Sequence, residues 1–127
     1  GDSEAELRKH LDLVRSVCFN ESGKLVISGS KDRTVLVWDT TTRSCLRKLS
    51  GHKAVIRAVH AAGQKIISCS QDKTVRLWNA DSGDCEAVLS GHENDIRSVC
   101  MDATASIGVS CGFDKSVRVW DLKQWTE

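Results

Sequence analysis

The sequence contains no proline, which is compatible with central strands because proline cannot donate to a ladder of hydrogen bonds. It also lacks any apolar stretch near the roughly 18 residues of a membrane span, so we expect no association with a membrane. Charge of one sign does not dominate, since 18 Lys and Arg against 17 Asp and Glu leave a net charge of +1. This balance argues against a dedicated nucleic-acid-binding protein, because such proteins typically carry a strong excess of basic residues. We expect a cytoplasmic location, with a nuclear one as the alternative.

No Cys-x-x-Cys pair occurs among the six cysteines, so the spacing of a common zinc site is missing. The cysteines instead recur in pairs at matching positions of the repeat described next, as Cys45 and Cys85, Cys69 and Cys111, and Cys18 and Cys100. Cysteines that follow a repeat act as small apolar residues on strands. We expect reduced, buried thiols, with disulfides as the less favoured alternative, and neither a metal nor a cofactor.

One ten-residue pattern is written three times. It reads SKDRTVLVWD at 30–39, SQDKTVRLWN at 70–79 and GFDKSVRVWD at 112–121. Its tryptophans are separated by 40 and 42 residues, and a period near 40 indicates a repeat architecture. We divide the chain into units at about 10–51, 52–91 and 92–127.

Within each unit the hydrophobic period is two, as expected of strands. The short β-branched runs VRSVCF, KLVISGS and TVLVWD are divided by turn residues, which is typical of strands joined by tight connections. In the first unit we expect strands at about 13–19, 24–30, 33–38 and 44–49, and no helix of useful length. The sequence therefore predicts a single all-β domain of three four-stranded sheets over residues 1–127.

These motifs resemble the WD-repeat β-propeller family over the whole chain. The resemblance rests on Gly-His at 51–52 and 91–92 and on Trp-Asp at 38–39 and 120–121. Two departures occur, because Lys9-His10 replaces the usual Gly-His and Trp78-Asn79 replaces Trp-Asp. The resemblance implies that the sheets are blades forming part of a β-propeller, and that the protein is an interaction scaffold without catalysis.

Each unit contains one His, one Ser, one Asp and one Trp at matching positions. They are His10, Ser28, Asp32 and Trp38; His52, Ser68, Asp72 and Trp78; and His92, Ser110, Asp114 and Trp120. A Ser, a His and an Asp suggest a hydrolase. A hydrogen-bond chain from Trp through Ser and His to Asp, however, satisfies every member. A hydrolase needs one such site with an oxyanion hole rather than three copies under a tryptophan, so we favour a structural network over catalysis.

Three blades are fewer than the roughly four to eight that close a propeller. The family resemblance implies that each blade takes its outer strand from the start of the next repeat. Residues 3–8 align with the outer strand at 45–50, and the last unit lacks such a strand. We therefore predict that residues 3–8 pair with a neighbouring copy and close a ring, as a six-bladed dimer or, less favoured, a nine-bladed trimer. The alternative is an excised fragment of a longer single-chain propeller.

The resemblance also implies partner-contacting positions at one mouth of the central channel. Carried over to this sequence, they are Leu13, Arg15, Lys31, Val55, Arg57, Gln71, Asp95, Arg97 and Phe113. The three arginines share one repeat position, and in a closed ring they predict a circle of guanidiniums that suits an acidic peptide or carboxylate. The alternative is that each pairs with a nearby carboxylate, with Asp95 as one candidate. We expect protein or peptide partners and other copies of the chain, and no nucleic acid.

Overall fold

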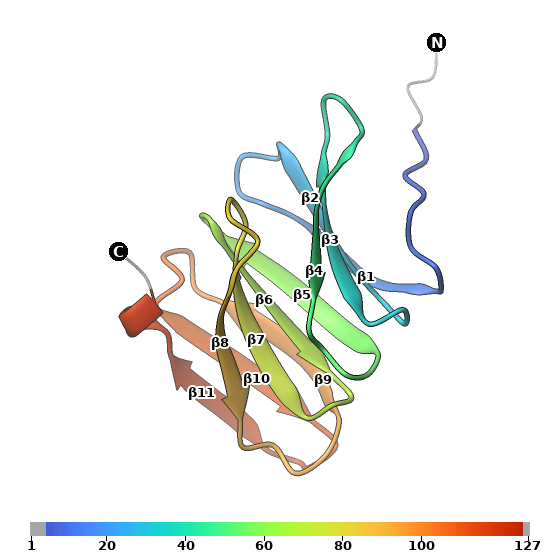
Figure 1. The fold of residues 1–127 in the computed structure, drawn as a ribbon. Coiled ribbons are helices and arrows are strands. Elements are labelled where there is room, and N and C mark those ends of the chain that lie inside the picture. The colour runs from blue at the N-terminus through green and yellow to red at the C-terminus, as the bar shows by residue number, and fades with distance from the viewer. Residues whose placement is uncertain (1–4, 126–127) are drawn as a thin grey trace.

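The computed structural model describes residues 5–125, which form three antiparallel sheets (Figure 1). The first sheet has the order β1 (Val14–Phe19), β2 (Leu25–Ser30), β3 (Thr34–Asp39) and β4 (Cys45–Ser50). The second has the order β5 (Ile56–Ala62), β6 (Lys65–Ser70), β7 (Thr74–Asn79) and β8 (Cys85–Ser90). The third contains β9 (Ile96–Met101), β10 (Ile107–Gly112) and β11 (Val117–Asp121), and a 3-10 helix η1 (Lys123–Trp125) follows it.

The predicted all-β class is confirmed, and the strands of the first unit begin and end within one residue of the prediction. The third sheet has three strands, which differs from the general expectation of four per sheet but agrees with the prediction that the last unit lacks its outer strand. The repeat position at which β4 and β8 begin falls at residue 127, which lies outside the described residues. Among residues 5–125, no helix is long and apolar enough to cross a membrane.

The segment predicted as an outer strand for another copy carries no strand in this structure. Residues 5–8 are described and have no assigned secondary structure, while residues 3 and 4 lie outside the described residues. A single chain does not test pairing between copies. The role of residues 3–8 and the closure of a ring therefore stay predictions.

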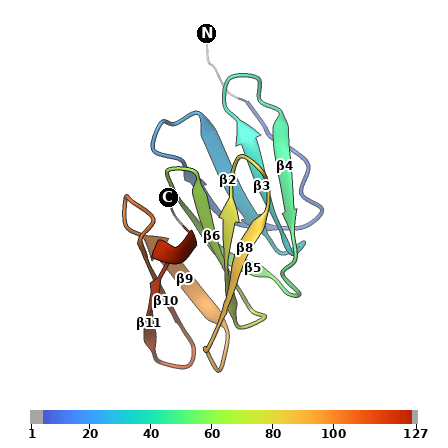
Figure 2. The ribbon, with the colours of Figure 1, turned by 60° about the vertical axis from the view of Figure 1, so that its left-hand side comes forward.

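The three sheets lie side by side in chain order (Figures 1 and 2), joined through their first strands. The backbone N–H of Val59 on β5 donates to Ser16 Oγ on β1 at 3.1 Å. The backbone N–H of Met101 on β9 donates to His60 Nδ1 on β5 at 3.0 Å. The second sheet is thus bonded to both of its neighbours.

The core sits in the two junctions between sheets rather than inside any one sheet. Side chains of a strand alternate between its faces, so each sheet offers an apolar set to each side. The first junction packs Ile27, Val35, Val37 and Leu49 against Ile56, Val59, Ile66 and Trp78. The second packs Ile67, Val75, Leu77 and Leu89 against Ile96, Val99, Met101 and Leu122. Full burial of one such side chain stabilises by roughly 1.5–3 kcal/mol.

At the two ends of this row, the same repeat positions are open to solvent. Val17 of β1 is 65% exposed, whereas Val59 at the matching position of β5 is 6% exposed. At the other end, Val117 and Val119 of β11 are each 70% exposed. Their counterparts on β3 and β7 are fully or almost fully buried, as Val35, Val37, Val75 and Leu77. Both end faces therefore have the composition of a junction but no partner within residues 5–125.

The cysteines are less uniformly buried than expected. Cys69 is buried between the second and third sheets, but Cys85 and Cys100 are exposed. Cys100 holds the repeat position of His60, which faces the next sheet, and within the described residues no fourth sheet follows β9. Burial raises the pKa of the Cys69 thiol to about 12, so this cysteine is a neutral, small core side chain.

Close packing of the first two sheets depends on Gly29. A Cβ on residue 29 would lie 2.5 Å from Ile56 Cγ2 and 2.9 Å from Val59 Cγ1. The matching residues of the other units are Cys69 and Cys111. The spacing of the first junction is thus set by a residue that the repeat does not share.

We predict that Gly29→Cys lowers the free energy of unfolding by roughly 1–3 kcal/mol in urea titrations, because the added atoms overfill the first junction. The exposed Thr41→Cys controls for an added thiol and should change stability by less than about 0.5 kcal/mol. Equal stability of Gly29→Cys and the parent chain would contradict the close approach of β2 and β5.

Candidate functional site

The four recurring side chains lie within hydrogen-bond distance of one another in each unit. In the first, Trp38 Nε1 donates to Ser28 Oγ at 2.8 Å, and Ser28 Oγ lies 2.7 Å from His10 Nε2. His10 Nδ1 lies 2.8 Å from Asp32 Oδ2. The same distances recur in the sets His52, Ser68, Asp72 and Trp78, and His92, Ser110, Asp114 and Trp120.

The chemistry of the end groups sets the direction of each chain. An indole N–H only donates and a carboxylate only accepts. The serine hydroxyl therefore donates to the histidine Nε2, and the histidine Nδ1–H donates to the aspartate. Tryptophan comes from the third strand of a sheet, serine from the second, histidine from the loop before the first strand, and aspartate from the tight turn. One chain of bonds thus joins two strands, a loop and a turn.

A fifth residue of each chain was missed by the sequence analysis. Thr34 Oγ1 donates to Asp32 Oδ1 at 2.6 Å, and the same contact is made by Thr74 and Ser116 to Asp72 and Asp114 at 2.5 and 2.7 Å. A hydroxyl residue two positions after the turn aspartate recurs in all three units, so the signal was present. Its meaning depends on the backbone of the turn, which bends the hydroxyl back onto the carboxylate.

These donors hold the turn aspartates in the ionised form. Burial raises the pKa of Asp32, but hydrogen bonds from Thr34, the Leu11 N–H and His10 outweigh it and lower the pKa to about 2. Burial likewise raises the pKa of Asp72, and hydrogen bonds from His52 and Thr74 bring it well below its usual range. In the third unit the Ser116 hydroxyl is the main cause of a lowered Asp114 pKa.

The departure at Asn79 keeps the turn that aspartate makes elsewhere. Asp39 Oδ1 accepts the N–H groups of Thr41 and Thr42 at 2.7 and 3.0 Å. Asn79 Oδ1 accepts those of Asp81 and Ser82 at 2.9 and 3.1 Å. An amide oxygen serves as acceptor in place of a carboxylate oxygen, which is why asparagine fits here.

The departure at Lys9 is matched by a second departure on the third strand. Gly51 has a φ of +152°, and a Cβ there would lie 2.6 Å from Arg76 Nη1; at Gly91, with a φ of +153°, it would lie 3.0 Å from Arg118 Nη1. In the first unit, Leu36 holds the position of these arginines. No guanidinium competes for the space there, and Lys9 does not share the positive φ of Gly51 and Gly91, so a side chain at residue 9 is tolerated.

The nine predicted partner positions gather at one edge of the sheets, beside the tight turns. The N–H of Lys31 donates to the Leu13 carbonyl at 2.8 Å, that of Gln71 to Val55 at 3.1 Å and that of Phe113 to Asp95 at 2.9 Å. Leu13, Lys31 and Phe113 are exposed, and Val55, Gln71 and Asp95 are half-buried. The structure therefore pairs the start of each first strand with the turn of the same unit.

The three arginines between these pairs have different surroundings. Arg57 Nη2 lies 3.9 Å from Asp95 Oδ2, and the Arg97 guanidinium carbon lies 4.2 Å from the centre of the Phe113 ring. Arg15 is exposed. Burial, together with the charges of Arg97 and Arg15, lowers the pKa of Arg57. Among the described residues, Arg57 is the one of the three with an ion pair, so the expectation that each pairs with a carboxylate is met only there.

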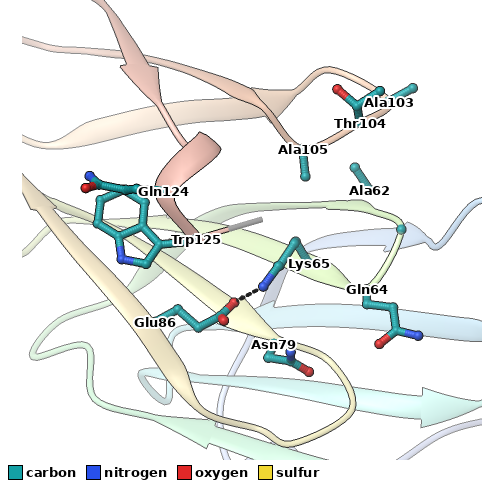
Figure 3. Close-up of a pocket in the computed structure, with 11 residues that line it drawn as sticks. Ala62, Gln64, Lys65, Asn79, Glu86, Ala103, Thr104, Ala105, Gln124 and Trp125 are labelled. Carbon is teal, nitrogen blue, oxygen red and sulfur yellow. Dashed lines mark hydrogen bonds and ion pairs between the residues drawn. The ribbon is translucent and has the colours of Figure 1, made fainter. Parts of the chain in front are cut away.

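A pocket of about 770 Å³ opens between the second and third sheets, at the edge away from the tight turns. Figure 3 shows the Lys65–Glu86 ion pair inside it, with Trp125 on one side and Gln64 on the other. Trp125 is half-buried against the core of this junction. Because Lys65 and Glu86 neutralise each other, the pocket carries no excess charge. Sequence analysis missed it, since its walls come from two units.

The chain matches the family described as WD domain, G-beta repeat, over residues 1–39, 43–79 and 83–121. It therefore belongs to the WD40-repeat family, whose repeats are generally non-catalytic and typically mediate protein interactions. Across residues 5–125, no three His, Cys, Asp or Glu side chains are grouped so that they could hold a metal ion.

The curated relatives are partial matches to longer proteins. The chain is 45% identical over 53 residues to "Dynein assembly factor with WD repeat domains 1" of Xenopus laevis, covering 42% of this chain and 13% of that protein. It is 42% identical over 48 residues to "Ribosome biogenesis protein BOP1 homolog" of Drosophila grimshawi, covering 38% and 6%. It is 41% identical over 59 residues to "Polyadenylation factor subunit 2" of Gibberella zeae, covering 46% and 10%.

We predict that Ser68→Ala lowers the thermal midpoint, because it leaves the Trp78 N–H and His52 Nε2 without their shared partner. Each unsatisfied buried group costs roughly 1–3 kcal/mol. The matched control is Ser90→Ala on β8, whose exposed side chain makes no such bond and whose loss should cost less than about 0.5 kcal/mol. Equal midpoints for the two variants would show that the buried chain contributes nothing to stability.

Stability should also fall at acidic pH through the turn aspartates. A carboxylate whose pKa is lowered by folding contributes stability that is present above its unfolded pKa, about 3.9, and is lost as pH falls through the folded value. For Asp32 that window runs from about pH 4 down to about pH 2. In urea titrations, Asp32→Asn should make the decline shallower there, and the exposed Asp81→Asn should leave it unchanged. An unaltered slope in Asp32→Asn would refute the assignment.

Proposed function

We propose that this protein is a non-catalytic, protein-binding scaffold whose three sheets are consecutive blades of a larger propeller. The observation that carries the proposal is the pair of open end faces. Val17 at one end and Val117 and Val119 at the other match positions that are buried in both internal junctions. Exposed apolar faces and unpaired strand edges are a liability, so each end is built to receive a further blade.

The source of the missing blades has two candidate arrangements. Relatives of which the matched segment covers only 6–13% favour a longer single chain that carries the other blades. The second arrangement is a ring of identical copies, six blades from two chains or nine from three, with residues 3–8 pairing beside β11 of a neighbour. The unpaired edge of β11 favours it. The expected cytoplasmic or nuclear location stays a prediction in either arrangement.

The geometry of the serines supports a scaffold over the hydrolase alternative. Ser28, Ser68 and Ser110 are buried, and each hydroxyl already accepts from a tryptophan and donates to a histidine. A nucleophile needs a lone pair directed at substrate and a nearby oxyanion site. A serine held beneath an indole has neither, and three equal copies suit a structural role. We assign the twelve side chains to the stability of the blades.

The partner surface that we propose is the edge that carries the tight turns. Rigid sheets hold its loops in place. Its exposed side chains Leu13, Lys31 and Phe113 come from the first and third units, and the second unit contributes the half-buried Val55 and Gln71. Binding sites are often carried on loops that a rigid scaffold positions. An acidic peptide suits this edge, because Arg15, Arg57 and Arg97 lie along it while Asp95 offers one opposing charge.

We predict that completing the third sheet and adding a fourth raises the denaturation midpoint. An extended chain in which residues 1–121 are followed by a second copy of residues 80–121 keeps the register, since Ala80 and Leu122 share a repeat position. Each added repeat contributes its own stability and one new interface. The gain should disappear when the first copies of Val117 and Val119 are both replaced by aspartate.

Solution mass separates the two arrangements. The unmodified chain should sediment as one copy if further blades belong to a longer polypeptide, and as two or three copies if it closes a ring with itself. The scaffold proposal fails if the extended chain gains no stability and the unmodified chain is a monomer that binds no apolar dye. Its ends would then not be junction faces.

A further inference from the structure

The two junctions between sheets are filled differently at the edge away from the tight turns. In the first junction, Arg47 of β4 donates through Nη2 to the backbone carbonyl of Asp81, in the turn that follows β7. A Cβ on Gly83 in the same turn would lie 3.4 Å from Arg47 Cδ, so the arginine also packs against the turn. An arginine side chain thus spans this edge from the first sheet to the second.

The second junction exchanges large and small side chains at the same repeat positions. Ala87 stands where the first junction has Arg47, and Trp125 stands where it has Gly83. The methyl group of Ala87 cannot reach across to the third sheet, and Trp125 is half-buried against the core of the junction. No arginine therefore spans this edge of the second junction, and the pocket of about 770 Å³ opens there beside Trp125.

The pocket contains the groups that a guanidinium needs. Glu86 gives Oε1 to Lys65, while its Oε2 has no hydrogen-bond partner among the described residues. The indole of Trp125 lies beside this ion pair (Figure 3) and offers a ring to a cation. Gln64 and Gln124 also line the pocket, and their amide oxygens can accept N–H groups. A guanidinium carries five N–H donors in a planar fork, so it can use the carboxylate, the indole and an amide oxygen together.

The chain around the pocket is acidic, although Lys65 and Glu86 neutralise each other inside it. Most of the lining residues lie in the segments 62–65, 79–86 and 102–105. These segments contain one lysine and four acidic residues. Two of the acidic residues, Asp81 and Asp84, are exposed in the turn after β7. Charges of one sign around a cleft raise the local concentration of ligands of the opposite sign, so this edge favours a cation.

We propose that this pocket binds an arginine side chain of a partner peptide, with its guanidinium on Glu86 Oε2 and against the indole of Trp125. The inference rests on the proposed role as a protein-binding scaffold and adds a second surface, at the edge opposite the tight turns. Arginine is the side chain that spans the same edge of the first junction, as Arg47. It is preferred over lysine because a planar guanidinium bonds a carboxylate and stacks on an aromatic ring at once.

The size of the pocket indicates a peptide rather than free arginine. Its volume of about 770 Å³ falls within the roughly 300–1,000 Å³ of pockets that hold drug-sized ligands. One side chain would fill only a part of it, so the backbone on either side of the arginine also enters. Lys65 competes with the ligand for Glu86, which limits the affinity.

The test is an NMR titration of the full chain with the acetylated, amidated tripeptide Gly-Arg-Gly, followed through the indole N–H signal of Trp125. Peptides with lysine, glutamate or citrulline in place of arginine, and free L-arginine, are the comparison ligands. Citrulline keeps the planar end group and loses the charge. We expect the arginine peptide to bind at least tenfold more tightly than the citrulline and glutamate peptides. It should bind at least threefold more tightly than the lysine peptide and free arginine.

Each comparison can overturn one part of the proposal. Equal binding of the citrulline or glutamate peptide would refute recognition of a cation. Equal binding of the lysine peptide would refute arginine as the ligand, and equal binding of free arginine would refute a peptide as its source. A Trp125 signal that does not move when the arginine peptide binds would refute the pocket as the site.

A variant that fills the pocket from within provides a matched control. Ala87→Arg restores the arginine of the first junction, so it should weaken the arginine peptide at least tenfold. Val88→Arg adds the same charge at the next position of β8, where the side chain is exposed, and should change the affinity less than twofold. Equal affinities of these two variants would contradict the proposal. If Ala87→Arg does not fold, Glu86→Gln replaces it and should also weaken binding at least tenfold.

Lys65→Gln separates a binding site from a structural ion pair. It should strengthen the arginine peptide severalfold, because it removes the competing cation. If Lys65 and Glu86 only stabilise the sheet, Lys65→Gln will lower the thermal midpoint and leave the affinity unchanged, and the proposal is wrong. Failure of peptide binding with an intact gain in the extended chain would leave the arrangement of blades standing. Binding of the arginine peptide without that gain would do the reverse.

Discussion

A sheet that is apolar on both faces must have a neighbour on each side, and this constraint organises the whole protein. The second sheet satisfies it, and its strand β6 is accordingly the most deeply buried, with five of its six residues buried. The first and third sheets satisfy it on one side only. On their other side they expose valines at positions that are buried elsewhere. Burial between sheets supplies the main favourable term in folding, so the architecture is stable to the extent that the row of sheets is continued.

The hydrogen-bond chains act within each sheet rather than between sheets. Packing holds one sheet against the next, whereas the chain from tryptophan to aspartate holds the loop and the turn against the strands of one sheet. Both are needed at the edge where we propose the partner surface, because the loop that contains His52 leads into β5, the strand that carries Arg57. A polar network in a dry interior stabilises only when each member is satisfied, and Thr34, Thr74 and Ser116 complete the acceptors that four residues alone would leave open.

The repeat made the elements predictable, because a period of two and a period near 40 both leave traces in every unit. Strand limits within one residue and the position of each histidine, serine, aspartate and tryptophan follow from alignment of the units with one another. Features that differ between units could not be predicted from this alignment. The fit of Gly29 against Ile56, the pocket beside Trp125 and the surroundings of the three arginines depend on distances across a junction. Alignment of the units shows which residues share a repeat position, but it does not show which residues of the next sheet they contact.

The three repeats are not interchangeable. In the second and third units a glycine meets an arginine, as Gly51–Arg76 and Gly91–Arg118. In the first unit a lysine and a leucine hold these two positions. In the sequence, Lys9 precedes the first two strands and Leu36 follows them. If two units exchanged sequence at a breakpoint between residues 10 and 35, Lys9 would be combined with an arginine at the position of Leu36. A breakpoint between Leu36 and Gly51 would keep each pair together. Duplication or shuffling of these blades, in evolution or by design, is therefore constrained to boundaries on the outer half of the sheet.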